Sequence, residues 1–193
     1  KRFGVSVTTD NRYCAQQADI VVLAVKPQVM GDVCRDIAPV VQNTRPLMVS
    51  IAAGLTADTL DTWLGGGLPL VRVMPNTPSL VGKGAAGLFA NSQVKDDQRN
   101  AVQKVFESIG SALWVDDENL LHSVTALSGS GPAYFFLMLE ALESAATEAG
   151  IESETARALA IQTMAGAAEM AARSEDDPGQ LKRNVMSPGG TTE

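Results

Sequence analysis

The first half of the chain alternates between short apolar runs and amphipathic segments. A continuous β-branched run such as residues 19–25 is typical of a strand buried on both faces of a sheet. Similar runs predict further strands over residues 46–54, 68–74, 86–89 and 112–115, and the polar-apolar period predicts helices over residues 28–39 and 96–109 and another that starts after Thr56. Thr56 is the expected N-cap of that helix, with Asp58 in its first turn. Strands separated by helices predict an α/β fold with a doubly wound, mostly parallel sheet.

Beyond residue 116 the pattern contains helical signals and no strand signals. A helix over residues 132–150 is apolar on almost every face, and the next one carries alanines on several faces. Helices of this kind must be buried on several sides, and two or three of them cannot cover that much apolar surface alone. The pattern therefore predicts two domains, residues 1–116 and 117–193, and a homodimer formed through the second.

Composition and charge exclude several classes of function. The 193 residues carry a formal net charge of −7 and no run of Lys or Arg, which argues against a nucleic-acid partner. No apolar stretch reaches the roughly 18 residues that span a bilayer, so no membrane association is expected. Cys14 and Cys34 have neither disulfide-framework density nor metal-ligand spacing, so we expect no metal and a cytoplasmic location.

Small and polar residues follow the predicted strands where a parallel sheet binds its ligands. The strand ends read AVKP (residues 24–27), SIAAG (residues 50–54) and MPNTP (residues 74–78), and helix N-termini are expected beside them. Lys26 is the one positive charge at the end of its strand, where it would contact a bound nucleotide. A solvated loop lysine without such a role is an equally good interpretation. The G-x-G-x-x-G phosphate loop is absent, and residues 65–67 (Gly-Gly-Gly) instead predict a helix C-cap and a turn.

Two glycine-containing segments bracket the helical half. SGSGPAYFF (residues 128–136) predicts a helix that breaks and restarts at Pro132, and SPGGTTE (residues 187–193) predicts another helix start. Exposed backbone N–H groups at such a start suit a single carboxylate. Taken singly, either segment is more often simple helix capping.

Together these segments carry a family resemblance. The strings ALSGSGPAYFF and PGQLKRNVMSPGGTTE, preceded in order by ADIVVLAVKP, VSIAAG and VRVMPNTPSLVGKGAAGL, resemble the pyrroline-5-carboxylate reductases. The resemblance implies a Rossmann-like dinucleotide-binding domain over residues 1–116 that lacks its first βαβ unit. It also implies a helical dimerisation and substrate domain over residues 117–193, cut short at its C-terminus, so we expect the chain to be part of a longer protein.

The resemblance also implies an activity and a set of site residues. The activity is the NADPH- or NADH-dependent reduction of 1-pyrroline-5-carboxylate to L-proline, the last step of proline biosynthesis, in homodimers that can assemble further. The expected cofactor contacts are Asn11, Ala24, Val25, Lys26 and Ala53. The expected substrate contacts are Glu175, Gly190, Thr191, Thr192 and Glu118. Thr192 is expected to be catalytic, with its hydroxyl hydrogen-bonded to the imine nitrogen.

Two other functions remain open at this point. A β-hydroxyacid or 6-phosphogluconate-type dehydrogenase joins a similar nucleotide domain to a helical half, but it uses a catalytic lysine there, and Lys182 is the only lysine after Lys104. A non-catalytic dimeric scaffold would account for the alanine-rich helices and the missing phosphate loop. Saturable binding of a nicotinamide cofactor would distinguish an enzyme from a scaffold.

Overall fold

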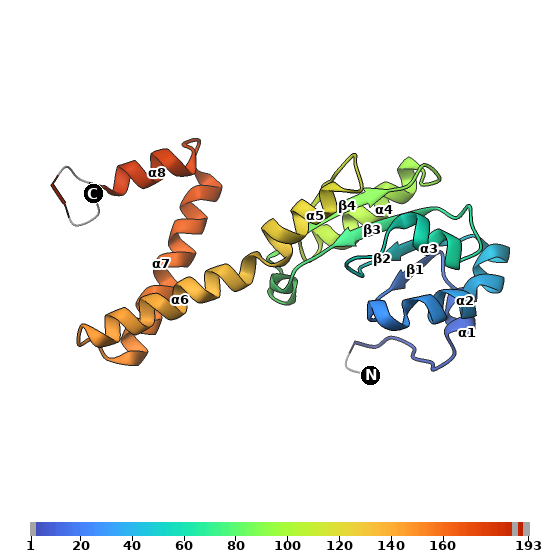
Figure 1. Cartoon of the computed structure of the whole chain (residues 1–193), viewed down its shortest axis with the longest axis horizontal. Coiled ribbons are helices and arrows are strands. Elements are labelled where there is room, and N and C mark those ends of the chain that lie inside the picture. Colours follow the sequence, from blue (N-terminus) through green and yellow to red (C-terminus); the bar gives the residue numbers. More distant parts are fainter. Residues whose placement is uncertain (1–2, 187–188, 191–193) are drawn as a thin grey trace. The chain divides into compact units, whose positions relative to one another are not determined.

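The fold consists of two compact units, a sheet unit over residues 1–132 and a helical unit over residues 133–193. The computed structural model describes residues 3–186 and 189–190. Figure 1 shows the sheet and its helices in the first unit and the long helices of the second. None of the helices in these described ranges is long and apolar enough to cross a membrane.

A five-stranded sheet organises the first unit, with the strand order β1-β2-β3-β4-β5. The strands are β1 (Ile20–Leu23), β2 (Leu47–Ser50), β3 (Leu70–Met74), β4 (Gly84–Ala90) and β5 (Gly110–Trp114). All neighbours are parallel except β3 and β4, which are antiparallel. The predicted mostly parallel α/β sheet is confirmed, and the five predicted strands differ from these only at their ends.

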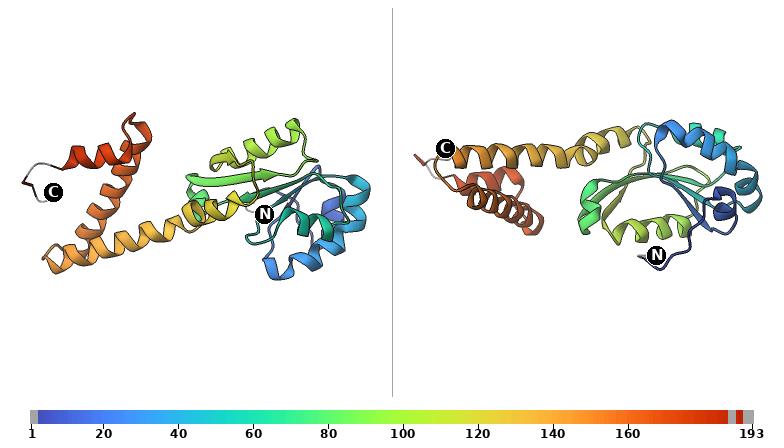
Figure 2. Two further views of the ribbon diagram at one scale, coloured as in Figure 1. Left: turned by 45° about the horizontal axis from the view of Figure 1, so that its top comes forward. Right: turned by 90° about the horizontal axis from the view of Figure 1, so that it is seen from below.

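Helices cover both faces of this sheet (Figure 2). They are α1 (Asn11–Gln16), α2 (Pro27–Thr44), α3 (Ala57–Trp63), the 3-10 helix η1 (Thr77–Val81), α4 (Asp96–Glu107), α5 (Leu120–Val124) and the π-helix η2 (Thr125–Gly129). Alternate strand residues point to opposite faces. Met48 and Leu70 therefore pack in the core under α2 and α3, whereas Val49 and Val71 pack in the core under α4.

Helix α2 is longer than the sequence predicted. It was expected to end near Pro39, because proline removes a helical hydrogen bond. It continues to Thr44, with Pro39 inside it and Arg45 as a left-handed C-cap. Ile37 and Val41 on either side of the proline are 2% and 0% exposed, so packing on the sheet compensates for the lost hydrogen bond.

Sequence signals mark both ends of α3. Thr56 caps α3 as predicted, because its hydroxyl accepts a hydrogen bond from the Thr59 backbone N–H at 3.2 Å. Gly65, Gly66 and Gly67 all have positive φ, which confirms the predicted glycine turn after α3. The C-cap itself lies one residue earlier than predicted, at Leu64.

Helix α5 packs directly on strand β4. A Cβ atom placed on Gly87 would lie 2.7 Å from Cγ1 of Val124, so no larger residue fits under the helix without a shift. Because α5 and η2 contact β4, the first compact unit extends to Pro132 rather than to residue 116. The division into residues 1–116 and 117–193 stays a prediction about the limits of the two functional domains.

The second unit is entirely helical over its described residues. It contains α6 (Gly131–Glu148, whose first two residues belong to the first unit), α7 (Ser153–Arg173) and α8 (Pro178–Val185). The predicted helix restart at Pro132 is confirmed within one residue. Among the described residues of this unit, the buried side chains are the alanines at 156 and 160 of α7. By contrast, Phe136 and Leu137 of α6 are 64% and 66% exposed. The apolar faces of α6 that were predicted to be buried are therefore open in the single chain.

Candidate functional site

The carboxyl ends of β1 and β2 form one edge of the sheet, and most of the predicted cofactor residues lie there. The two strands are parallel and their last residues, Leu23 and Ser50, are in register. The loops that follow them carry residues 24–26 and Ala53, all exposed. The structure thus brings Ala24, Val25, Lys26 and Ala53 to the same edge.

This edge also offers the positive end of a long helix. Lys26 is the N-cap of the 18-residue α2 and its side chain makes no capping hydrogen bond. Pro27 at the start of this helix has no N–H group, and the Val29 N–H donates to the Lys26 carbonyl at 3.1 Å, so the attraction for an anion at this end comes mainly from the helix dipole. Small exposed residues let a flat ligand approach the backbone, and a Cβ on the neighbouring Gly54 would meet nothing within 4 Å. The residues of this edge fit a nicotinamide dinucleotide.

Asn11 is the exception among the predicted cofactor residues. It is the exposed first residue of α1. The adjacent Arg12 binds Asp36 of α2 through its guanidinium, with an NH2–Oδ1 distance of 2.8 Å. Helix α1 packs against α2, the helix that begins after Lys26, and the role of Asn11 as a cofactor contact stays a prediction.

Glu118 is held against the sheet by two hydrogen bonds to one oxygen. Its Oε1 accepts from the backbone N–H of Ala57 at 2.6 Å and from NH1 of Arg72 at 2.8 Å. Ala57 is the first residue of α3, which follows the carboxyl end of β2. The predicted substrate residue therefore lies near the loop that carries Ala53.

Arg72 is a charged residue of this region that the sequence prediction did not single out. It is the third residue of β3 and its side chain is 8% exposed, while that of Glu118 is 23% exposed. A signal was present in the sequence, because an arginine inside the apolar run LPLVRVM needs a buried partner. The partner could not be read from the sequence, since 46 residues separate the two.

The remaining predicted substrate residues belong to the helical unit. Glu175 lies exposed in the turn between α7 and α8, two residues before the N-cap Asp177. Gly190 lies exposed beyond the other end of α8. Thr191 and Thr192 lie outside the described residues. The structure shows no contact among the described residues that joins Glu175 to Gly190.

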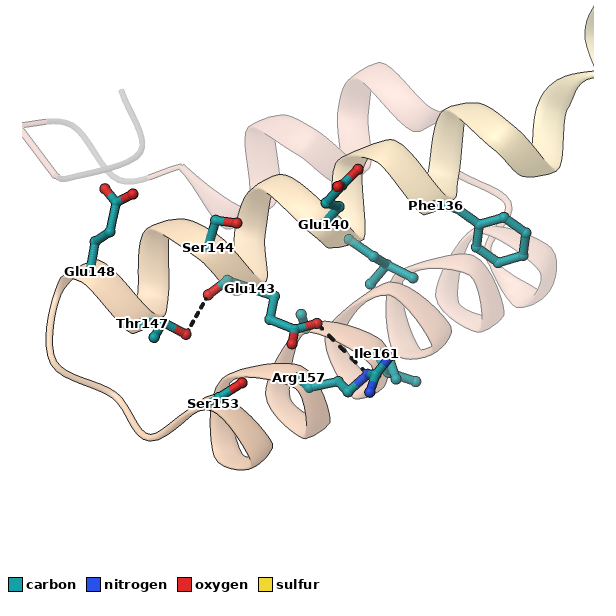
Figure 3. Close-up of a pocket in the computed structure, with 11 residues that line it drawn as sticks. Phe136, Glu140, Glu143, Ser144, Thr147, Glu148, Ser153, Arg157 and Ile161 are labelled. Atoms are coloured by element: carbon teal, nitrogen blue, oxygen red, sulfur yellow. Dashed lines mark hydrogen bonds and ion pairs between the residues drawn. The ribbon is translucent and has the colours of Figure 1, made fainter.

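A groove of about 750 Å³ runs between α6 and α7 within the helical unit. Figure 3 shows Glu143 of α6 pointing toward Arg157 of α7, with the two charged groups 3.7 Å apart. Phe136 and Ile161 line the same groove. None of the predicted site residues lines it, so we treat the groove as part of an exposed helix surface and not as the catalytic site.

Comparison with known proteins adds an independent line of evidence. Residues 118–193 match the family described as pyrroline-5-carboxylate reductase dimerisation, and residues 1–54 match the family described as NADP oxidoreductase, coenzyme F420-dependent. The chain is 48% identical to the pyrroline-5-carboxylate reductase of Pseudomonas aeruginosa over 191 residues, which cover 99% of this chain and 70% of that protein. It is 44% identical to the enzyme of the same name from Vibrio alginolyticus, with 98% of this chain and 70% of that protein covered.

Solved structures give the same result. The chain superimposes on a pyrroline-5-carboxylate reductase from Coxiella burnetii with a TM-score of 0.94 and 46% identity, covering 100% of this chain and 71% of that one. A Plasmodium falciparum pyrroline carboxylate reductase with NADP bound gives a TM-score of 0.88 and 37% identity, covering 96% and 70%. The resemblance inferred from the sequence strings is confirmed. The chain belongs to the pyrroline-5-carboxylate reductase family.

Proposed function

We propose that this protein reduces 1-pyrroline-5-carboxylate to L-proline with NADPH or NADH, the last step of proline biosynthesis. The observation that carries the proposal is the 48% identity to a pyrroline-5-carboxylate reductase along 99% of the chain. The exposed sheet edge at residues 24–26 and Ala53 supports it, because it offers a cofactor the backbone surface and helix end that a dinucleotide needs.

The cofactor residues of this proposal are Ala24, Val25, Lys26 and Ala53, together with Asn11. When bound, a reduced nicotinamide supplies the hydride for the C=N bond. Lys26 contributes a charge-assisted contact to the anionic part of the ligand, and the dipole of α2 acts in the same direction.

The substrate residues of this proposal are Gly190, Thr191, Thr192, Glu175 and Glu118. The backbone N–H groups of the Gly-Thr-Thr segment bind the substrate carboxylate, because glycine allows a close approach. The Thr192 hydroxyl then hydrogen-bonds the ring nitrogen and orients the imine. A protonated imine is already electrophilic, so no strong side-chain acid is required.

The same proposal includes a homodimer in the cytoplasm. The open apolar surface of α6 supports self-association, because a monomer rarely exposes so large an apolar patch. The match of residues 118–193 to a dimerisation family supports it further. Assembly of dimers into a higher oligomer belongs to the proposal as well. The cytoplasmic location rests on the two cysteines of the sequence, which lack the density of a disulfide framework.

The test is a steady-state assay of the intact enzyme with pyrroline-5-carboxylate and each cofactor, combined with Thr192→Ala. We expect turnover in the wild type and a kcat lower by about ten- to a thousandfold in the variant, the range for losing a positioned hydrogen-bonding group. The KM for cofactor should stay unchanged.

Thr147→Ala is the matched control, because its hydroxyl donates only to the Glu143 carbonyl on the exposed surface of α6. It should leave kcat unchanged. A normal kcat in Thr192→Ala would remove Thr192 from the mechanism. A wild-type protein that binds neither cofactor would instead favour a dimeric scaffold. Binding without turnover of this substrate would favour the β-hydroxyacid type of dehydrogenase.

A further inference from the structure

The loop between β2 and α3 is one of the two loops proposed to contact the cofactor. It covers residues 51–56 and carries two exposed residues, Ala53 and Gly54, at its tip. Gly54 has a φ of 76°, a left-handed conformation that residues with a side chain rarely adopt. The loop starts beside the other proposed cofactor loop, because the Ile51 backbone N–H donates to the Leu23 carbonyl at 3.2 Å. The position of the tip therefore depends on how the two ends of the loop are held.

Polar side chains hold both ends of this loop. At its start, Ser50 is 1% exposed and its Oγ accepts a hydrogen bond from the Ala52 backbone N–H at 3.3 Å. At its end, Oε1 of Glu118 accepts from the Ala57 backbone N–H at 2.6 Å. Glu118 lies 61 positions further along the chain than Ala57. The far end of the loop is thus fixed by a tertiary contact and not by the sequence of the loop itself.

Arg72 in turn holds the carboxylate that makes this tertiary contact. It is the middle residue of β3 and is in register with Ser50 of β2. Its NH1 group donates to the same Oε1 of Glu118 at 2.8 Å, and its side chain is 8% exposed. Two donors on one oxygen fix that oxygen at the start of α3, where the loop ends.

Stability alone explains this arrangement poorly. Removing two charges from water costs free energy that their attraction often fails to recover. The Nε atom of Arg72 is buried and has no hydrogen-bond partner within the part of the chain that the structure describes, which adds a further cost. Helix α3 also has other capping groups, because the Thr56 hydroxyl accepts from the Thr59 N–H. Asp58 adds a negative charge in its first turn. The buried ion pair therefore points to a role for the loop that it holds.

We propose that Arg72 is a positioning residue for the cofactor, which acts through Glu118 on the far end of the loop at residues 51–56. The inference rests on the function proposed above, because that function makes Ala53 a cofactor contact. A loop held at both ends presents its tip in one conformation before the cofactor arrives. Binding then requires less ordering of the loop and is tighter than binding to a loop held at one end only.

The test measures binding to the intact enzyme without substrate, using whichever reduced dinucleotide, NADPH or NADH, binds the wild type more tightly. Arg72→Met should raise the Kd in a fluorescence titration by about three- to thirtyfold, the range for a residue that acts on a site through its neighbours. Hydrogen–deuterium exchange should become faster over residues 51–57 and stay unchanged over β1. In the Glu118→Ala background, Arg72→Met should raise the Kd no further, because the arginine acts through Glu118.

A merely structural arginine predicts a different pattern. Arg72→Met would then lower the melting temperature and leave the Kd of the folded enzyme unchanged, whether or not the loop exchanges faster. That result would overturn the inference, and so would an effect of Arg72→Met that persists in full in the Glu118→Ala background. Arg99→Met is the matched control, since Arg99 lies on α4 and stacks on Trp114 at 4.2 Å; it should leave the Kd and the exchange of residues 51–57 unchanged.

A second variant covers the case in which Arg72→Met does not fold. Arg72→Lys keeps the charge but loses the planar fork, so we expect it to fold and to raise the Kd by a smaller factor. An unchanged Kd in Arg72→Lys would count against the inference. A wild-type enzyme that binds neither dinucleotide would refute the proposed function itself, and this failure is therefore distinguishable from a failure of the inference alone.

Discussion

At the scale of single residues, the two cysteines differ sharply in their surroundings. Cys34 is 0% exposed in the core between α2 and the sheet, whereas Cys14 is exposed on α1. Burial raises the pKa of the Cys34 thiol from 9.0 to about 11, and the nearby Arg35 guanidinium lowers that pKa by less. The thiolate is the reactive form, so Cys34 should be inert at neutral pH.

Thiol titration checks this difference. At pH 8 the native protein should react with Ellman's reagent at one thiol, Cys14, and at two thiols after denaturation. Cys14→Ala should abolish the fast reaction, while Cys34→Ala should leave it unchanged. Fast modification of both thiols in the native protein would contradict the burial of Cys34.

The raised pKa also gives a pH dependence with a definite sign. A folded-state pKa above the unfolded value means that the folded protein binds the proton more tightly, so the stability gained from Cys34 is complete below about pH 9. It is lost as the pH rises from 9 to about 11. Over that window, the difference in free energy of unfolding between the wild type and Cys34→Ala should shrink.

At the scale of elements, α3 illustrates how a local signal fixes a boundary. Thr56 caps the helix and Ala57, its first residue, donates to Glu118. Thr56→Ala should lower the free energy of unfolding by about 1 kcal/mol, the usual value of an N-cap hydroxyl. Thr62→Ala, on an exposed position later in α3, is the control and should have a smaller effect in chemical denaturation. Equal losses would show that the cap contributes nothing.

Elements such as this could be predicted because their signals are local. Thr56, the Gly65–Gly67 turn and the apolar runs of the strands all act on their immediate neighbours. The end of α2 was missed because it depends on the burial of Ile37 and Val41, which is set by distant parts of the chain. The ion pair between Arg72 and Glu118 was missed for the same reason, although Glu118 itself was named from the family strings.

At the scale of the whole molecule, the helical unit is rich in apolar residues, yet many of its large apolar side chains are exposed in the single chain. Tyr134, Phe135 and Met138 of α6 are each more than half exposed in the single chain. Burial of such side chains is worth roughly 1.5–3 kcal/mol each. A second copy of the chain would supply the missing cover.

Assembly is therefore the prediction at this scale. Leu137→Glu combined with Leu142→Glu should convert the proposed dimer into a monomer in sedimentation at micromolar concentration, because charged residues on an apolar interface are costly to bury. Val105→Glu is the control: this valine is 51% exposed on α4 of the sheet unit, so its replacement should leave the dimer intact. A wild-type protein that sediments as a stable monomer would refute the dimer.

The contact between Gly87 and Val124 constrains how this family can vary. A Cβ at residue 87 would lie 2.7 Å from one methyl group of Val124 and 2.8 Å from the other, so any larger residue there requires the Val124 side chain or α5 to shift. The two positions therefore share one space: a larger side chain at residue 87 requires a smaller one at residue 124. Across related sequences the volumes at these two positions should be anticorrelated, and a relative with alanine at the first should carry a smaller residue than valine at the second.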